Sequence, residues 1–107
     1  MSSFYDALET RSPQEREAAL MAALPGQVAH AQQRSTAFAG ILAGVDAASI
    51  TTREALAQLP VTRKYELLER QQAQRASNVF GGFSALGFGP DMRRVFASPG
   101  TIYEPEG

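Results

Sequence analysis

The strongest candidate for chemistry is a short loop of small and hydroxyl-bearing residues near the C-terminal end of the sequence. Ser98, Gly100 and Thr101 follow the apolar residues 95–97, which belong to a strand that we predict at about 93–97. Small residues let backbone N–H groups and hydroxyls approach an anion closely, as they do in phosphate-binding loops. The pattern therefore indicates a phosphate loop or, in its simpler interpretation, an ordinary strand-to-loop turn.

Other side chains with chemical potential are few. The sequence has no cysteine, which excludes disulfides, thiol catalysis and Cys-ligated metals within these residues. Its single histidine, His30, is predicted to be a surface or boundary residue, and one histidine makes a zinc site improbable. Arg93 and Arg94 are typical of a solvated strand edge, and contact with an anion near the loop is the alternative.

Four aromatic residues cluster in the same part of the sequence. They could line a pocket for an aromatic acid, but core packing is the favoured interpretation; the four are Phe80, Phe83, Phe88 and Phe96.

The composition limits the classes of partner. The 107 residues carry 10 basic and 11 acidic side chains, so the net charge is -1. Nucleic acids and anionic membranes both attract a basic surface, and neither is predicted as a partner. No apolar run approaches the roughly 20 residues that span a bilayer. The first residues also lack the pattern of a signal peptide, so a cytoplasmic location is predicted.

The side chains above must be positioned by helices, and a capping pattern marks the first one. Ser12 can cap the helix, Pro13 suits its first position, and Glu15 completes a capping box. An apolar stripe with helical spacing continues past Pro25 and consists of Leu20, Leu24, Val28 and Ala31. We therefore predict one kinked helix over about 12–33 rather than two separate helices.

Shorter elements follow. Residues 35–46 are predicted to be a connecting stretch anchored by Phe38, Ile41 and Leu42 and ended by Gly44. A short helix is predicted over about 52–58, capped by Thr51 or Thr52 and ended by Pro60.

A further helix is predicted to begin at Thr62. Thr62 acts as its cap, with Lys64 in a solvated first turn and Glu66 where the helix dipole favours an acid. Leu67 and Leu68 form its inward face. From Ser77 onward, glycine, phenylalanine and proline predict irregular backbone with short strands. The predicted fold is thus mainly α with a short β element near the C-terminus.

Two stretches of the sequence carry a family resemblance. "LPVTRKYELLERQ" and "VFASPGTIYEP" resemble the N-terminal region of phenylacetate–coenzyme A ligases, which belong to the acyl-adenylate-forming superfamily. The first stretch matches the family's Pro-x-Thr-x-Lys-x-(Asp/Glu)-Leu pattern at Pro60, Thr62, Lys64, Glu66 and Leu67. The second stretch stands where the family has a strand and a Ser/Thr/Gly-rich loop. The resemblance as a whole covers about residues 5–105.

In that family the loop wraps the phosphates of ATP during adenylation. The resemblance therefore implies that Ser98, Gly100 and Thr101 bind the nucleotide, and Pro105 also matches. The family's second Ser, second Thr, second Gly and Lys are replaced by Pro99, Ile102, Tyr103 and Glu104. Glu104 places a negative charge where the family has a cation, and Tyr103 removes the backbone freedom of glycine.

The resemblance also implies how the chain is divided and to what kind of larger protein it belongs. Residues 1–76 would be a helical N-terminal segment, and 77–107 a Gly/Phe-rich loop, a strand and the start of a degenerate phosphate loop. Both would belong to a larger α/β adenylating enzyme that activates a carboxylic acid, with an aromatic acid as one option. That enzyme uses ATP and Mg²⁺ and forms a thioester with coenzyme A.

The family's acyl pocket and catalytic Lys lie beyond the loop. The 107 residues alone are therefore predicted to be inactive, to need no cofactor of their own and to act with the remainder of the parent enzyme. The alternative is a small helical interaction or oligomerisation module without catalysis, for which a homo-oligomer is an option.

Overall fold

Helices followed by one β-hairpin make up the chain. The computed structural model describes residues 3–106. Within them the elements are the 3-10 helices η1 (Ala7–Thr10) and η2 (Ala47–Ser49), the helices α1 (Pro13–Arg34), α2 (Thr36–Ile41), α3 (Arg53–Ala57) and α4 (Lys64–Gln74), and the strands β1 (Arg94–Ser98) and β2 (Ile102–Glu106). The mainly α class with a short β element near the C-terminus is confirmed.

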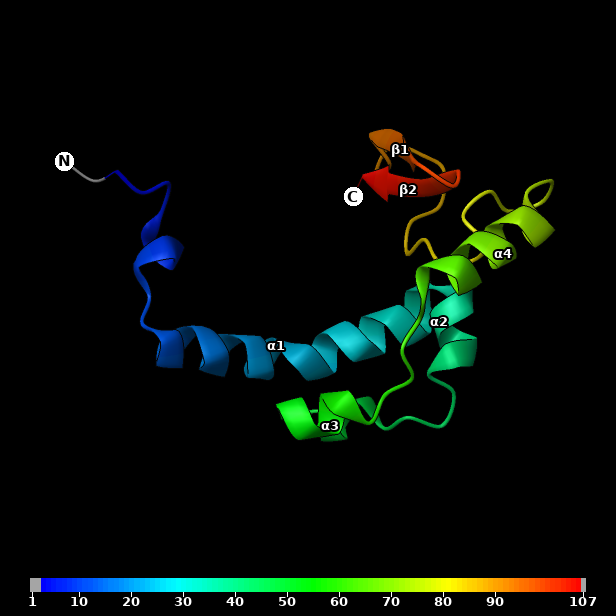
Figure 1. Cartoon of the computed structure of the whole chain (residues 1–107). Helices are drawn as coiled ribbons and strands as arrows, with labels where there is room; N and C mark the ends of the chain where they lie inside the picture. The colour runs from blue at the N-terminus through cyan, green and yellow to red at the C-terminus, as the bar shows by residue number, and fades with distance from the viewer. Residues whose placement is uncertain (1–2, 107) are drawn as a thin grey trace.

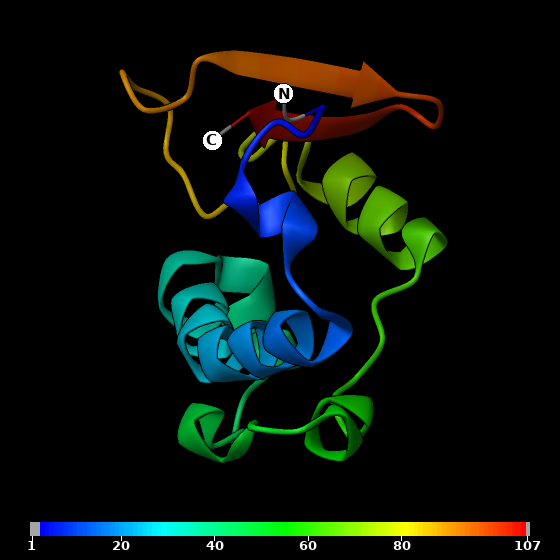
Figure 2. The ribbon, with the colours of Figure 1, turned by 90° about the vertical axis from the view of Figure 1, so that its left-hand side faces the viewer.

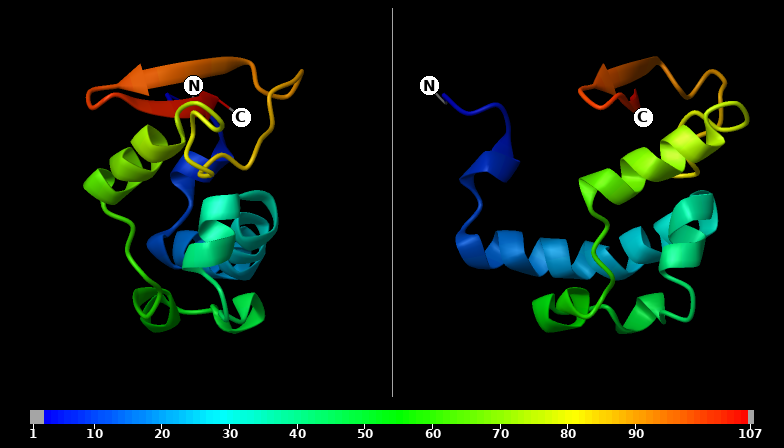
Figure 3. Two further views of the ribbon diagram at one scale, coloured as in Figure 1. Left: turned by 90° about the vertical axis from the view of Figure 1, so that its right-hand side faces the viewer. Right: turned by 45° about the vertical axis from the view of Figure 1, so that its right-hand side comes forward.

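The elements lie in three levels. Figures 1 and 2 show α1 and α2 in the middle, η2 and α3 on one side of them, and α4 with the hairpin on the other. The N-terminal arm, which contains η1, rises from the start of α1 on the same side as the hairpin. Figure 3 shows the arm and the hairpin widely separated, near opposite ends of α1.

Helix α1 forms as its capping pattern predicts. The Ser12 side chain accepts a hydrogen bond from the Glu15 N–H, and the Glu15 carboxylate accepts one from the Ser12 N–H. The backbone N–H of Ser12 and then its hydroxyl lower the pKa of Glu15. The helix continues through Pro25 without ending, and Figure 1 shows a shallow bend midway along it. The prediction of one continuous helix is confirmed.

The core lies between α1, α2 and the segment around η2. Val28, Leu42 and Ile50 are buried and form its centre. Partly buried apolar residues surround them, namely Leu24, Ala31, Phe38, Ile41, Val45, Ala47, Ala55 and Leu59. Leu20 was also expected in the buried stripe, but it is 51% exposed and is not part of the core cluster.

Residues 35–46 are more regular than expected. They include helix α2, whose N-cap Ser35 accepts a hydrogen bond from the Phe38 N–H. The three predicted anchors, Phe38, Ile41 and Leu42, do pack in the core. Gly44 has a φ of 80° and lies at the end of the turn that follows α2. A one-and-a-half-turn helix was missed because its length and glycine content give no strong periodic signal.

The N-cap predictions for the next two helices have different outcomes. Thr52 caps α3 through its hydroxyl, which accepts a hydrogen bond from the Ala55 N–H, as predicted. The predicted cap Thr62 is wrong, because α4 begins at Lys64 and its N-cap residue is Arg63. Glu66, three residues after Arg63, accepts a hydrogen bond from the Arg63 N–H at 2.8 Å. The acid therefore determines where the helix begins.

The neighbouring glycines Gly81 and Gly82 connect helix α4 to helix α2. The carbonyl of Gly82 accepts hydrogen bonds from the Ala37 N–H at 2.9 Å and the Ser35 hydroxyl at 2.8 Å, at the start of α2. Gly81 lies against the backbone of α4, where a Cβ would be 2.9 Å from the Gln71 nitrogen. Both glycines have positive φ, 63° and 85°. The loop can pass between α2 and α4 only because these positions lack side chains.

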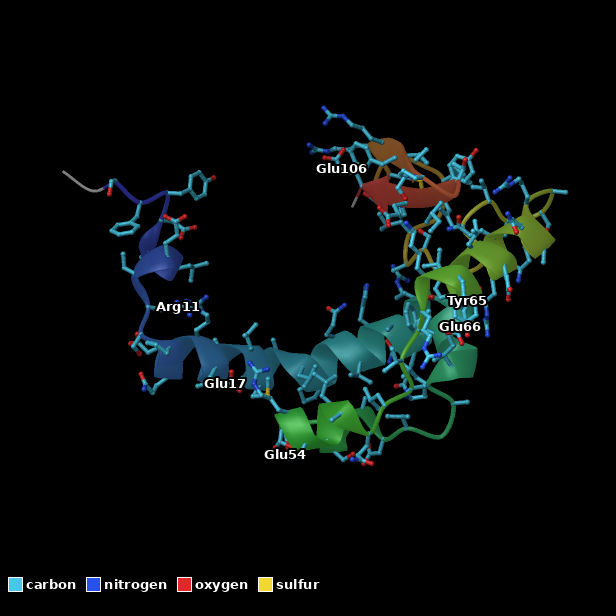
Figure 4. All side chains as sticks on the ribbon, in the orientation of Figure 1. Arg11, Glu17, Glu54, Tyr65, Glu66 and Glu106 are labelled. Carbon is cyan, nitrogen blue, oxygen red and sulfur yellow. The ribbon has the colours of Figure 1, made fainter. Side chains whose placement is uncertain are left out.

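The first prediction concerns an ion pair between α1 and α3. Arg53 donates to both carboxylate oxygens of Glu17, with Nη2 2.7 Å from Oε2. Figure 4 shows Glu17 on the side of α1 that faces α3. The hydrogen bond from Arg53 lowers the pKa of Glu17 from the ordinary 4.5. We expect an NMR titration to find this lowered pKa and Arg53→Ala to return it to the ordinary value. Arg34→Ala, which removes an arginine elsewhere on α1, is the control and should leave it unchanged.

The sign of the pH effect follows from the direction of this shift. Because the pKa of Glu17 is lower in the folded chain, the pair contributes stability above the unfolded value of 4.5. That contribution is lost as the pH falls through the folded pKa. Arg53→Ala should therefore destabilise the chain at neutral pH and have little effect at pH 2. An equal effect at both pH values would contradict the assignment.

Candidate phosphate-binding site

The residues predicted to bind phosphate lie at the tip of the β-hairpin. Strand β1 pairs antiparallel with β2, and Ser98 is opposite Ile102. Pro99, Gly100 and Thr101 therefore form the connection between the strands. The predicted strand 93–97 is found one residue later, at Arg94–Ser98.

The second half of the predicted loop is a strand. Residues 102–105 were expected in the phosphate loop, but they belong to β2. Ile102 explains the difference, because its β-branched side chain favours extended backbone and is only 3% exposed beneath the hairpin. The loop is thus limited to three residues and its flanking strand ends.

The three predicted site residues are close together. Ser98 is half-buried, whereas Gly100 and Thr101 are exposed at the turn. Gly100 has a φ of 152°, and a Cβ there would lie 3.2 Å from the Ile102 Cγ1. Glycine is therefore required at this turn for the backbone conformation, independently of any ligand. Whether these residues bind phosphate stays a prediction.

Helix α4 holds the return strand of the hairpin through one side chain. The Gln71 amide donates to the Tyr103 carbonyl at 2.9 Å and accepts from the Tyr103 N–H at 2.9 Å. It also donates to the Phe80 carbonyl at 3.3 Å. Gln71 is 1% exposed, and its amide satisfies three backbone groups at once. The position of the loop relative to α4 therefore depends on Gln71.

Arg75 is the C-cap residue directly after α4 and lies four residues beyond Gln71. Its Nη2 is 3.4 Å from the Thr101 carbonyl oxygen, and its Cζ is 5.6 Å from the centre of the Tyr103 ring. A guanidinium group is thus placed beside the predicted phosphate loop. No residue of the loop itself supplies a positive charge.

A cleft of about 290 Å³ lies between α4, β2 and the loop that follows Gly82. Its walls include two of the four clustered phenylalanines, Phe80 and Phe83, together with Thr62, Gln71 and Glu104. The expected core packing holds for Phe80, which is 3% exposed. It is wrong for Phe88 and Phe96, which are 75% and 50% exposed; the Phe88 ring stacks on Phe80, with 5.6 Å between the ring centres, but stays largely open to solvent.

The remaining sequence candidates lie at the surface. His30 and Lys64 are exposed, as predicted. Arg93 and Arg94 are exposed as well, and Arg94 Nε lies 3.6 Å from Glu106 Oε2 across the strand pair. Among residues 3–106 no group of three or more His, Cys, Asp or Glu side chains could hold a metal ion. Nor does any helix of the described chain have the length and apolarity needed to cross a membrane.

Gln71, Arg75 and the Gly81–Gly82 pair were not singled out from the sequence. A signal for the first two exists, because Leu67, Gln71 and Arg75 recur every four residues and so share a helix face. The glycine pair signals positive φ in the sequence, but not which helices it touches.

The chain matches no known family model, and no curated protein or solved structure is significantly similar to it.

Proposed function

We propose that the chain is the N-terminal segment of a phenylacetate–CoA ligase-like enzyme, which activates a carboxylic acid with ATP and forms an acyl-CoA thioester. The observation that supports this most is the packing of the two stretches that resemble the family. Helix α4 begins in the first stretch and binds the second through Gln71 and Tyr103. Thr62 and Glu104, one from each stretch, line the same cleft.

The loop suits the chemistry of adenylation. In that reaction a carboxylate oxygen bonds to the α-phosphorus of ATP, the bond from this phosphorus to the bridging oxygen breaks, and pyrophosphate leaves. Charge therefore develops on the departing phosphates, and donors placed there in advance stabilise it. The hydroxyls of Ser98 and Thr101 are such donors. Thr101 is exposed on the turn and Ser98 is half-buried at the adjoining end of β1, so a large ligand can approach the turn from solvent.

The open shape of the chain favours a larger parent protein. Its radius of gyration is 16.6 Å, whereas a compact domain of this length has roughly 13 Å. Its accessible surface is 7733 Å², against about 5,800 Å² for a compact monomer of its mass. Large apolar side chains are exposed at both ends of the molecule, including Phe4, Tyr5, Leu8, Phe88, Val95 and Phe96. The remainder of an α/β enzyme would cover such surfaces.

The test uses the full-length product of the gene that encodes the chain. Exchange of labelled pyrophosphate into ATP should depend on an added carboxylic acid, with phenylacetate as the first to try. The double variant Ser98→Ala, Thr101→Ala should reduce the exchange at least tenfold, whereas Thr10→Ala on the distant arm should not. A gene product that binds no ATP, or a reading frame that ends near codon 107, would favour the interaction module instead.

A second prediction concerns the charge at Glu104. This carboxylate is exposed on β2, three residues from Thr101, so it repels phosphate at the loop. Repulsion between like charges near a surface is on the order of 1 kcal/mol or more at short range, and Glu104→Lys should therefore tighten ATP binding about fivefold.

Glu54→Lys is the matched control for this prediction. It makes the same change of charge on α3, at the far side of the molecule in Figure 4, and should have no effect. Isothermal titration with ATP and Mg²⁺ measures both variants. If Glu104→Lys binds ATP with the same affinity as the original protein, the loop does not face the phosphates.

A further inference from the structure

We propose that Arg75 is a phosphate-binding residue of this site and supplies, from helix α4, the positive charge that the loop itself lacks. The proposal rests on the proposed function and adds a residue to it. Between Ser98 and Glu106 the only charged side chains are those of Glu104 and Glu106. A polyphosphate bound at this turn therefore needs a cation from another element.

Two contacts place the Arg75 guanidinium beside the turn. Its Nη2 lies 3.4 Å from the carbonyl oxygen of Thr101, which is one of the predicted phosphate-binding residues. Its Cζ lies 5.6 Å from the centre of the Tyr103 ring, within the range of a cation–π contact. Residues 75 and 101 are 26 positions apart, so the contact is a product of the fold rather than of local sequence.

Most N–H donors of the Arg75 guanidinium group remain available to a ligand. It has five N–H donors, and the one contact with Thr101 is at the long end of hydrogen-bond distances. Neither of the two ion pairs found among residues 3–106 includes Arg75. The group is exposed, and its planar array of donors suits phosphate oxygens.

The groups next to the turn are otherwise unfavourable for an anion, which gives the Arg75 charge its importance. Helix α4 ends at Gln74, and the free carbonyls of a helix C-terminus act as roughly half a negative charge. Glu104 adds a negative charge on β2, three residues from Thr101, whereas Glu106 lies at the other end of the hairpin, where Arg94 pairs with it. Without Arg75, neither the turn residues nor the end of α4 would offer a positive charge to a phosphate. With it, the turn has one cation directly at the predicted loop.

The test compares ligands that differ in their phosphates. In the full-length protein, Arg75→Gln should weaken the binding of ATP and of tripolyphosphate at least tenfold and leave the affinity for AMP within twofold. Arg75→Lys should restore part of the affinity because it keeps the charge. The control is Arg16→Gln, which removes an exposed arginine on α1 and should change none of the three affinities. Equal thermal unfolding midpoints of the variants would show that the fold is intact.

Each other result decides against the proposal in a different way. If the original protein binds ATP and Arg75→Gln does not weaken it, Arg75 is not a ligand and the proposed function stands. If Arg75→Gln weakens ATP and AMP equally, Arg75 acts only on the structure of the loop. If the original protein binds neither ATP nor tripolyphosphate, the proposed function fails together with this inference.

Discussion

Replacing Gly81 by alanine is expected to lower the free energy of unfolding of the chain by about 2–5 kcal/mol, the sum of backbone strain and a steric overlap. The backbone of Gly81 has a φ of 63°, which side chains other than glycine rarely adopt. Its added Cβ would lie 2.9 Å from the Gln71 nitrogen and 3.0 Å from the Arg70 carbonyl carbon. Both atoms belong to the backbone of α4, so no side-chain rotation relieves the overlap.

The matched control is Gly26→Ala. Gly26 is inside α1, and apart from its chain neighbours and the adjacent backbone of the same helix no atom lies within 4 Å of the position of its added Cβ. Alanine is favoured over glycine in a helix by roughly 1 kcal/mol, so this variant should be slightly more stable than the original. Urea titration followed by circular dichroism, at one chain concentration, measures both. Similar midpoints for Gly81→Ala and the original chain would contradict the close packing of the loop against α4.

Loss of the packing of Gly81 would change how α4 and the hairpin are placed relative to the core around Val28. Gly82 binds the start of α2 through its carbonyl, while Gly81 lies against α4. A displaced glycine pair would therefore separate the helix that positions the hairpin from the core around Val28. The predicted loop would keep its sequence but lose its place relative to the rest of the molecule.

Local patterns in the sequence were sufficient for the helices that begin with strong caps. Ser12 and Glu15 define the start of α1, and Thr52 defines that of α3, because these side chains bond to the backbone within three residues. The continuation of α1 through Pro25 also followed from the unbroken apolar stripe. Such features depend on neighbours in the chain and are visible without the fold.

Features that depend on distant contacts were not predictable in the same way. Strand β2 was interpreted as loop because its extended backbone depends on pairing with β1 and on the burial of Ile102. The partner of Gln71 is 32 residues away, and that of Arg75 is 26 residues away. Phe88 and Phe96 were assigned to a core by composition alone, whereas both are at least half exposed in the fold.

Replacing Gln71 by leucine is expected to destabilise the chain by about 2–4 kcal/mol, because unpaired polar groups in a buried site each cost on the order of 1–3 kcal/mol. Leucine has a similar size but cannot bond to the N–H and carbonyl of Tyr103 or the carbonyl of Phe80. The apolar burial of leucine offsets only part of this loss. Hydrogen exchange should accelerate at Tyr103 and less around Val28, since the hairpin loses its attachment to α4 first.

The adjacent Gln72 offers a matched control. It is exposed, and its side chain makes no hydrogen bond to any of residues 3–106. Gln72→Leu therefore makes the same chemical change without unpaired groups and should alter stability by less than roughly 0.5 kcal/mol. Equal effects of the two substitutions would mean that the buried amide is not what holds the hairpin.

Gln71→Glu keeps the size and shape of the side chain and changes only the groups that form hydrogen bonds. A carboxylate can still accept from the Tyr103 N–H, but it would face the two carbonyl oxygens that the amide now binds as a donor. Burial and these oxygens favour the protonated acid, so we expect the pKa of the new glutamate to be raised in the folded chain. With a raised folded pKa, the variant is most stable below the unfolded value and loses stability as the pH rises through the folded one. Its deficit relative to the original chain should therefore shrink from pH 7 to pH 4, whereas that of Gln71→Leu should stay nearly constant. A deficit of Gln71→Glu that does not change with pH would show that position 71 does not face these carbonyl groups in solution.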